Sequence, residues 1–247
     1  MDYREHATKL SILPHPIKTQ GIRHRMGNHL LPGSCLLCST TSGNDLLCAD
    51  CRADLPPLPA ATCPICAEQT THGERCGACL RDPPNFGRTV ALFRYDFPLD
   101  RLIHALKYGH QLAVAPWCAT QLAAKLNGEH FDAVIPLPLH PARLQQRGFN
   151  QAAEIARHLG NHLRLDVDRS SLIRQHSTQP QANLPLAERR NNVRGAFECR
   201  TDFSGRHLLL LDDVLTTGAT ANECARVLRL HGAASVTVAV VARALKD

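Results

Sequence analysis

The stretch LLLLDDVLTTGAT, at residues 208–220, places two adjacent acids and three threonines directly after four leucines. The leucines are typical of a buried strand, which gains nothing from two neighbouring carboxylates. The Thr-Thr-Gly-Ala-Thr turn leads into a helix, where amides, a glycine and hydroxyls form a cradle for an anion. Carboxylates accept hydrogen bonds from ribose hydroxyls, or bind the Mg²⁺ that accompanies phosphates. The stretch therefore predicts a sugar-phosphate site; a plain strand followed by a capped helix explains neither acid.

A second segment with suitable chemistry begins at residue 136, among the prolines that end the short apolar run AVIPLP at 133–138. Arg143 and Arg147 suit a pyrophosphate, because the guanidinium fork matches phosphate oxygens. A solvated arginine surface is the alternative for either residue taken alone. Asn150 is expected to cap the helix that follows.

The most regular feature of the sequence is a repeat built from eight of its 11 cysteines. CLLCSTTSGNDLLCADC is followed by CPICAEQTTHGERCGAC with the same spacing, so the chain carries four Cys-x2-Cys knuckles. A knuckle turns both sulfurs toward one point, and two knuckles complete a tetrahedral thiolate shell for Zn²⁺. The sequence therefore predicts two zinc ions, bound by Cys35, Cys38, Cys48, Cys51, Cys63, Cys66, Cys76 and Cys79.

The sequence leaves two pairings of these knuckles open. Consecutive knuckles can share an ion, or knuckles from different halves can interleave. In either case a complete thiolate shell leaves no position for water, so we expect structural zinc and not catalytic zinc. Disulfides are the alternative, and the absence of a secretory signal pattern argues against them. Cys118, Cys199 and Cys224 stand outside the repeat, and we expect them to be buried small hydrophobic residues.

Helix and strand signals alternate after the cysteines. We expect strands at residues 89–94, 133–138, 208–212 and 235–242, and helices at 99–108, 112–126, 151–163 and 219–231. This alternation predicts an α/β fold, with a parallel sheet flanked by helices. In such sheets ligands bind beyond the carboxyl ends of the strands, which is where the stretch at 208–220 changes from strand to helix.

Composition divides the chain into four parts. Residues 1–27 are polar, lack a clear period, and are expected to be a disordered extension; translation from Met26 instead of Met1 is left open. Residues 28–82 form the cysteine module, residues 83–88 (PPNFGR) form a linker, and residues 89–247 form the large domain. There is no apolar signal region and no apolar run of the ~18–20 residues that a membrane helix needs. We therefore expect a cytoplasmic protein without a membrane span.

The stretch at 208–220 resembles the signature by which type I phosphoribosyltransferases bind 5-phosphoribosyl 1-pyrophosphate (PRPP): an apolar strand, two acids, then a Thr/Gly loop. The resemblance implies that the loop holds the 5′-phosphate, that the two acids hold the ribose 2′- and 3′-hydroxyls, and that Mg²⁺ accompanies PRPP. The implied PRPP-binding residues are Asp212, Asp213, Val214, Leu215, Thr216, Thr217, Gly218, Ala219 and Thr220. The implied pyrophosphate-binding residues are Leu137, Pro138, Arg143 and Arg147.

The polar segment at residues 177–190 resembles the flexible hood loop of the same enzymes, which closes over PRPP. Its Arg189 and Arg190 are then placed to reach the pyrophosphate. Closure of such a loop would exclude water from the reacting centre. A surface loop without a role is the alternative.

Two longer stretches narrow the resemblance. PLPLHPARLQQRGFNQA at 136–152 and RQHSTQPQANLPLAERRNNVRGAF at 174–197 are similar to signatures of the ComF/GntX group. A zinc module before a type I phosphoribosyltransferase-like domain is also typical of that group, and Lys107-Tyr108 is similar to its LKY element. The group is linked to bacterial competence and the use of external DNA, which implies a role in DNA uptake.

Two functions of different classes are therefore expected. One is a Mg²⁺-dependent phosphoribosyltransferase of unknown acceptor, with no catalytic residue assigned. The other is a non-catalytic module that binds PRPP or single-stranded DNA and docks a helicase-like or DNA-uptake protein. The net charge of +6 suits an anionic ligand in both cases, although ordinary solubility charge explains it as well. The aromatic content of 4% argues against strong generic single-strand binding.

Overall fold

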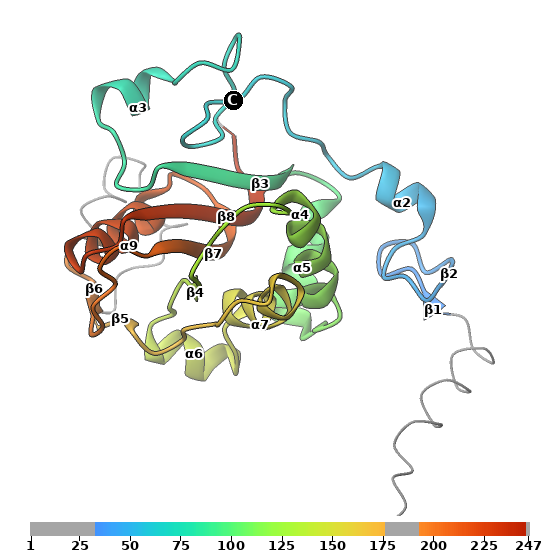
Figure 1. Cartoon of the computed structure of the whole chain (residues 1–247). Coiled ribbons are helices and arrows are strands. Elements are labelled where there is room, and N and C mark those ends of the chain that lie inside the picture. The colour runs from blue at the N-terminus through green and yellow to red at the C-terminus, as the bar shows by residue number, and fades with distance from the viewer. Residues whose placement is uncertain (1–32, 176–192, 246–247) are drawn as a thin grey trace, which may run out of the picture.

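The computed structural model describes residues 33–175 and 193–245, and a four-stranded sheet lies at its centre (Figure 1). The strands lie in the order β3 (Arg88–Arg94), β8 (Ser235–Arg243), β7 (His207–Leu215) and β4 (Ala133–Pro136). Each neighbouring pair in this sheet is parallel. Parallel pairing brings all four carboxyl ends to one edge, the edge at which α/β sheets bind their ligands. The predicted fold class is therefore confirmed.

β7 is the strand that the four leucines predict. The leucines at 208–211 are fully buried, because helices cover both faces of the sheet, and this explains why the run is apolar without interruption. The prediction that the strand ends at Asp212 was wrong. The strand continues to Leu215, since Asp212 is paired with Val240 and Val214 with Ala242 of β8. Both acids of the stretch therefore lie within the strand, on a rigid element.

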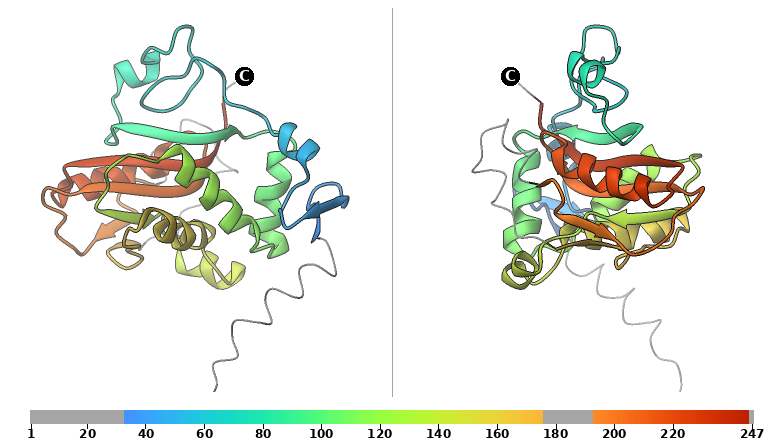
Figure 2. Two further views of the ribbon diagram at one scale, coloured as in Figure 1. Left: turned by 45° about the vertical axis from the view of Figure 1, so that its right-hand side comes forward. Right: turned by 90° about the vertical axis from the view of Figure 1, so that its left-hand side faces the viewer.

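Helices cover the sheet on both faces (Figures 1 and 2). They are α4 (Leu99–Gly109), α5 (Val114–Lys125), α7 (Gln151–Leu163) and α9 (Ala219–Leu230). α4, α5 and α7 pack in a core cluster that contains Leu209 and Leu211, whereas α9 packs in a second cluster that contains Leu208 and Leu210. Alternation of side chains along β7 thus divides the core into two. Among the described residues, no helix combines the length and the apolar character needed to cross a bilayer.

The three cysteines outside the repeat are buried, as predicted. Cys118 lies on α5, Cys224 on α9, and Cys199 on β6 (Phe197–Cys199), which pairs antiparallel with β5 (Leu172–Arg174). Burial raises the pKa of the thiols of Cys118, Cys199 and Cys224. These thiols therefore remain protonated and act as small apolar groups.

The cysteine repeat forms two small modules that pack on the large domain (Figure 1). The first contains β1 (Gly33–Ser34), β2 (Thr41–Gly43) and α2 (Ala49–Ala53), and the second contains α3 (Gly77–Arg81). Leu47 and Leu55 of the first module join the core cluster of α4, whereas Cys63 and Ile65 of the second join the core cluster of α9. Each module is therefore anchored to a different one of the two clusters.

The segment predicted as a linker, residues 83–88, is packed against the large domain. Phe86 is 3% exposed and belongs to the core cluster of α9. Asn85 donates from its backbone and its side chain to Asn222 Oδ1 on α9, over 2.6 and 3.0 Å. β3 begins at Arg88, within the same segment. The connection therefore fixes the second module in place.

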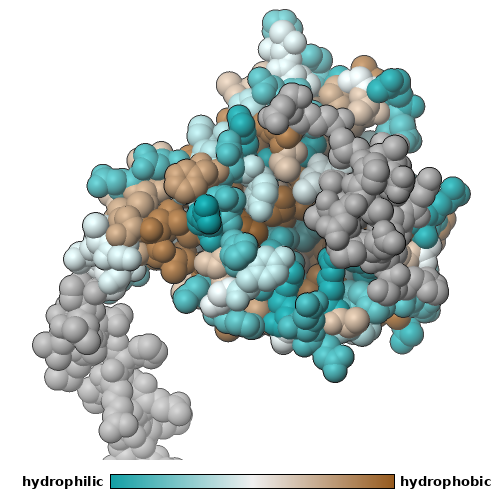
Figure 3. Space-filling view, turned by 180° about the vertical axis from the view of Figure 1, so that it is seen from behind, coloured by the Kyte–Doolittle hydropathy of each residue, from teal (hydrophilic) through white to brown (hydrophobic). Residues whose placement is uncertain are grey.

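An apolar groove of about 740 Å³ lies between the first module and α4. Its lining includes Leu36, Leu37, Phe97 and Pro98. Figure 3 shows apolar surface gathered at this end of the molecule. The groove is therefore an exposed apolar surface that joins the first module to the segment between β3 and α4.

Substitution of Leu209 tests the packing of helices against one face of the sheet. Leu209→Ala is expected to lower the free energy of unfolding by about 2–5 kcal/mol, because the residue is fully buried between β7 and the helices. Leu230→Ala, at an end of α9 where the side chain is 72% exposed, is the matched control and should change it by less than about 0.5 kcal/mol. Urea unfolding measures both, and equal losses would contradict the packing.

Candidate functional site

A pocket of about 720 Å³ lies at the carboxyl edge of the sheet, where β7 leads into α9. Segments that are far apart in the sequence line it: the end of β7, the loop before α9, helix α4, and α6 (Pro141–Arg147) after β4. Val214 and Leu215 are among the lining residues. The topology therefore brings the acid-and-threonine stretch and the arginine segment together in one place.

The loop between β7 and α9 is a tight turn. Gly218 has a φ of +77°, a left-handed conformation in which other residues are strained. Thr217 Oγ1 accepts a hydrogen bond from the Ala219 amide over 3.3 Å and so stabilises the start of α9. Thr216, Gly218, Ala219 and Thr220 line the pocket, whereas Thr217 lines a smaller cavity behind the loop. Amides in the first turn of a helix lack partners within the helix, so this turn suits an anion.

The two acids of the stretch lie on opposite faces of β7, because side chains alternate along a strand. Asp213 is 3% exposed and faces α4 and α7, whereas Asp212 lies on the side of Arg174 and Cys224. Asp212 Oδ1 accepts a hydrogen bond from the Asp213 amide over 2.8 Å, and both acids line the pocket. The two carboxylates are therefore not equivalent ligands, although they are neighbours in the sequence.

Asp213 is held by contacts that the sequence did not predict. Lys107 Nζ forms an ion pair with Asp213 Oδ2, and Gln151 Nε2 donates to Oδ1 over 3.4 Å. Arg147 Nη1 donates to Gln151 Oε1 over 2.7 Å, and its guanidinium lies 5.2 Å from the centre of the Tyr108 ring. This network ties α4, α6 and α7 to β7 at the pocket. The LKY resemblance gave the only hint of it, since Lys107 and Tyr108 both take part.

The two acids differ in their pKa for a physical reason. Burial and the neighbouring Asp213 carboxylate raise the pKa of Asp212 well above its usual range. Burial acts in the same direction on Asp213, but the Lys107 ammonium outweighs it and the pKa of Asp213 is lowered. Burial favours a neutral Lys107, and the Asp213 carboxylate reverses this and raises the pKa of Lys107. Asp213 is thus the ionised counter-ion of Lys107, and Asp212 is the acid that takes up a proton more readily.

The residues predicted to bind pyrophosphate lie on the α6 side of the pocket. Leu137, Arg143 and Arg147 line it, whereas Pro138 is not among its lining residues. Asn150 caps α7 as predicted, because its Oδ1 accepts from two amides of the first turn over 2.9 and 3.3 Å. Its Nδ2 also donates to the Leu137 carbonyl over 3.0 Å. One asparagine therefore fixes both the start of α7 and the loop after β4.

Arg174 at the end of β5 is a pocket residue that sequence reasoning did not select. It is 9% exposed, and its guanidinium lies 5.4 Å from the centre of the Phe197 ring. Burial and the nearby Arg143 charge lower the pKa of Arg174. Arg189 and Arg190, predicted to act from a hood loop, lie outside the described residues.

The eight knuckle cysteines form two clusters, and each cluster joins consecutive knuckles. The first contains Cys35, Cys38, Cys48 and Cys51, and the second contains Cys63, Cys66, Cys76 and Cys79. The sulfurs of each cluster all lie within 4.8 Å of one another. Sulfurs at about 2.3 Å from a tetrahedral Zn²⁺ lie about 3.8 Å apart. The observed Cys38–Cys48 and Cys66–Cys76 separations of 3.7 and 3.6 Å match this spacing.

The knuckles also prepare thiolates for a metal. Burial works against ionisation of Cys35, but the amides of Cys38 and Cys48 donate to its sulfur and bring its pKa to about 6. Cys63 in the second cluster is buried in the same way, and donation from the Cys66 and Cys76 amides brings its pKa to about 7. The pKa of Cys51 is raised instead, by neighbouring thiols of its cluster and by burial, and the pKa of Cys66 and Cys79 is raised by burial and by neighbouring thiols. Thiolate is the form that binds metal, so each cluster contains a cysteine that ionises readily, and four sulfurs together suit structural zinc.

Comparisons with known proteins agree with this two-part architecture. Residues 26–80 match the double zinc ribbon domain, and residues 119–247 match the phosphoribosyl transferase domain. The DNA utilization protein YhgH of Escherichia coli O157:H7 is 33% identical over 225 residues, which are 87% of this chain and 99% of that protein. Competence protein F of Haemophilus influenzae is 31% identical over 209 residues, which are 80% of this chain and 90% of that protein.

Among solved structures, the hypoxanthine phosphoribosyl transferase of Trypanosoma cruzi aligns with 51% of this chain and 60% of its own. The sequences are 16% identical in this alignment, and the TM-score is 0.33.

The sheet, the pocket at its carboxyl edge and the family matches define a phosphoribosyltransferase-type domain preceded by a double zinc ribbon. The chain belongs to the ComF/GntX family, as its motifs indicated, because relatives with competence and DNA-utilization names align over most of its length. The first and second modules are hereafter the first and second zinc ribbons.

Metal analysis tests the two cysteine clusters. We expect two equivalents of zinc per chain, since each cluster holds a complete set of four thiolates. Cys66→Ser/Cys76→Ser is expected to retain one equivalent, and Cys38→Ser/Cys48→Ser, its counterpart in the first ribbon, should also retain one. Loss of all zinc from either variant would contradict two independent sites.

Replacing Lys107 by Met removes the counter-ion of a buried carboxylate. We expect the free energy of unfolding at pH 7 to fall by about 3–5 kcal/mol. In the wild type, the lowered pKa of Asp213 gives stability that is present above the unfolded pKa and is lost as the pH falls through the folded pKa. In the variant no ammonium opposes burial, so the pKa of Asp213 is raised. Protonation of Asp213 in acid then removes the cost of burying an unpaired carboxylate, and the difference in stability between wild type and variant becomes smaller.

Urea unfolding at pH 7 and at about pH 5 measures both effects. Lys125→Met, at the exposed end of α5, is the matched control and should cost less than about 0.5 kcal/mol. The same loss for Lys107→Met at both pH values would contradict the ion pair.

Proposed function

We propose that this protein binds PRPP with Mg²⁺ in the pocket at the carboxyl edge of the sheet and transfers its phosphoribosyl group in the cytoplasm. The 5′-phosphate lies on the loop of residues 216–220, and the ribose lies at Asp212 and Asp213. The pyrophosphate lies near Leu137, Pro138, Arg143 and Arg147, with Arg189 and Arg190 of the hood loop reaching it on closure. The acceptor is a nucleophile of unassigned class.

The observation that carries this proposal is the charge distribution around one pocket. Lys107, Arg143, Arg147 and Arg174 line it together with the loop before α9. A sugar phosphate with a pyrophosphate group needs cations at one end, an anion cradle at the other, and hydrogen-bond acceptors between them. Asp212 and Asp213, which line the same pocket, supply the acceptors. Each component of the ligand therefore has a matching group.

The two acids have different parts in this proposal. The Asp212 carboxylate, raised in pKa and facing the pocket, accepts from the ribose hydroxyls or binds the Mg²⁺ that accompanies the pyrophosphate. Asp213 accepts from ribose and keeps the Lys107 ammonium in place beside the pocket. Mg²⁺, when bound, neutralises charge on the departing pyrophosphate. The remaining contribution of the chain is positional and electrostatic, and no general base is assigned.

A non-catalytic DNA-uptake module is the second candidate. The names of the relatives favour it, as does the apolar groove between the first zinc ribbon and α4, which can dock a helicase-like or DNA-uptake protein. In this case the pocket binds PRPP or the end of a nucleic acid without turnover. Basic residues of the large domain would contact the phosphates of single-stranded DNA.

Ligand binding and turnover separate the two candidates. Calorimetry is expected to show Mg²⁺-dependent binding of PRPP, and Asp212→Asn should weaken it about tenfold or more, the equivalent of ~1.4 kcal/mol. Arg147→Gln should weaken binding of PRPP and of pyrophosphate, because it removes a cation from the α6 side. Arg157→Gln, on the exposed surface of α7, is the matched control.

Pyrophosphate release from PRPP, measured with a panel of nucleobases and amines, then tests transfer. Release that Asp213→Asn abolishes would support the enzyme. No release with any acceptor, together with DNA binding that weakens steeply with salt, would support the second candidate. Absence of PRPP binding in the wild type would overturn the PRPP site, both as the site of an enzyme and as a site without turnover.

A further inference from the structure

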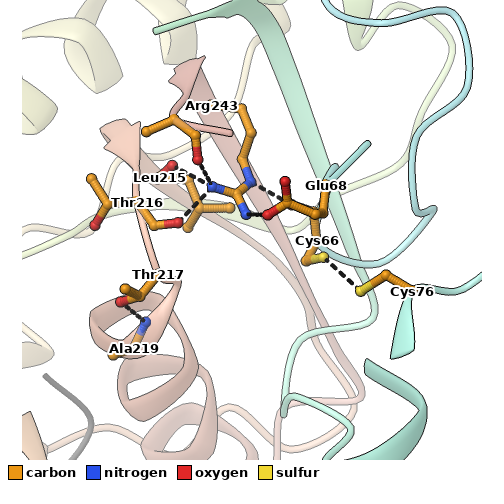
Figure 4. A network of polar contacts seen from close by, with 9 residues as sticks. Cys66, Glu68, Cys76, Leu215, Thr216, Thr217, Ala219 and Arg243 are labelled. Atoms are coloured by element: carbon orange, nitrogen blue, oxygen red, sulfur yellow. Dashed lines mark hydrogen bonds and ion pairs between the residues drawn. The ribbon is translucent and has the colours of Figure 1, made fainter. Parts of the chain in front are cut away.

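The second zinc ribbon is joined to the loop before α9 by one buried arginine. Arg243, the last residue of β8, is 4% exposed (Figure 4). Its Nε donates to the Cys66 carbonyl over 2.8 Å, and its Nη2 contacts Glu68 Oε2 over 2.7 Å. Its Nη1 donates to the Leu215 carbonyl over 3.0 Å and to the Thr216 carbonyl over 2.5 Å. One guanidinium therefore bridges the ribbon and the loop.

These contacts constrain the loop through the geometry of the peptide bond. In a trans peptide the C=O and the following N–H point in opposite directions within one rigid plane. Holding the carbonyls of Leu215 and Thr216 toward Arg243 therefore orients the amides of Thr216 and Thr217 away from it. The Ala244 amide also donates to the Leu215 carbonyl, over 2.9 Å. The two consecutive peptide planes at the start of the loop are thus held in place by hydrogen bonds to their carbonyl oxygens.

The ribbon also forms the back wall of the loop. A cavity of about 180 Å³ separates them, and its lining includes Cys79 and Phe86 on one side and Thr217 and Gly218 on the other. Cys79 and Phe86 share a core cluster with Leu215, the residue before the loop. The loop itself is joined to the ribbon by the polar contacts of Arg243.

Arginine is suited to this position for reasons of chemistry. Its planar fork donates in several directions at once, whereas a lysine ammonium would satisfy Glu68 and leave carbonyls without a donor. Glu68 neutralises the charge, and its side chain is 16% exposed against 5% for Arg243. Glu68 lies two residues after Cys66, a ligand of the second cluster, so a metal at that cluster would fix both contacts of the ribbon.

We propose that Arg243 is a positioning residue through which the second zinc ribbon sets the conformation of the phosphate loop. Zinc at the second cluster, but not at the first, then controls how tightly the loop binds a phosphate. The identity of the loop's ligand rests on the function proposed above, whereas the mechanical link rests on the contacts of Arg243 alone. The two are therefore tested by different measurements.

The mechanical link is tested by hydrogen exchange in the full chain without ligand. Arg243→Lys keeps the charge and the contact with Glu68. The two hydrogen-bonded amides that border the loop, Ala244 (to the Leu215 carbonyl) and Asn222 (to the Gly218 carbonyl), are expected to exchange about tenfold faster, while β7 keeps its protection. Arg226→Lys on α9 alters another guanidinium that contacts a glutamate, Glu223, and should leave the loop unchanged. Unchanged exchange of the loop in Arg243→Lys would overturn the proposal.

Zinc is tested with the two double variants already defined. Cys66→Ser/Cys76→Ser is expected to speed the exchange of the same two amides that border the loop, whereas Cys38→Ser/Cys48→Ser is not. Metal analysis confirms which ion each variant has lost. Equal exposure of the loop in both variants would overturn the link to the second cluster; a second-site variant that fails to fold leaves Arg243→Lys as the deciding measurement.

Ligand affinity separates positioning from general damage. Arg243→Lys is expected to weaken binding of ribose 5-phosphate about tenfold and to leave binding of Mg²⁺-pyrophosphate unchanged, because the function proposed above places the pyrophosphate on the α6 side and not on the loop. Equal weakening of both would mean that Arg243 has only a structural role and would overturn the proposal. If the wild type binds neither compound, the proposed function fails, and the exchange measurements still decide the role of Arg243.

Discussion

Parallel pairing of β7 between β4 and β8 is the constraint on which the rest of the structure depends. It places the carboxyl ends of the strands at one edge, so the loop after β4 and the loop after β7 meet at one pocket. It also requires helices on both faces, because a central parallel strand has no face left for water. The four leucines at 208–211 satisfy that requirement, and both the core and the site follow from their burial.

Within this frame, the alternation of side chains along β7 gives two neighbouring acids different environments. Asp213 faces α4 and is neutralised by Lys107, which keeps it ionised inside the protein. Asp212 faces the other side, and burial together with Asp213 raises its pKa. Asp212 can accept hydrogen bonds from ligand hydroxyls, while Asp213 keeps the Lys107 ammonium beside the same pocket.

The zinc ribbons are parts of the fold and not appendages to it. Each contributes residues to one of the two core clusters, and the packed segment around Phe86 leaves the second ribbon little freedom. A small module of this size cannot bury a core of its own, so thiolate–metal bonds and contact with a larger domain replace one. The second ribbon in turn provides the rear support of the loop before α9, through Arg243 and Glu68.

The sequence by itself determined the elements and the chemistry that short spacings encode. The knuckle spacing indicated two tetrahedral thiolate sites, and residues 151–163 were predicted as a helix with Asn150 as its cap, as observed. Tertiary structure alone decided which knuckles pair, how far β7 extends beyond Asp212, and the partners of Lys107, Arg174 and Arg243. The physical reason is that periodicity and capping act over a few residues, whereas these contacts join groups that only the paired sheet brings together. Cys66 and Arg243 are separated by 177 positions in the sequence, so no local pattern indicates the hydrogen bond that joins them.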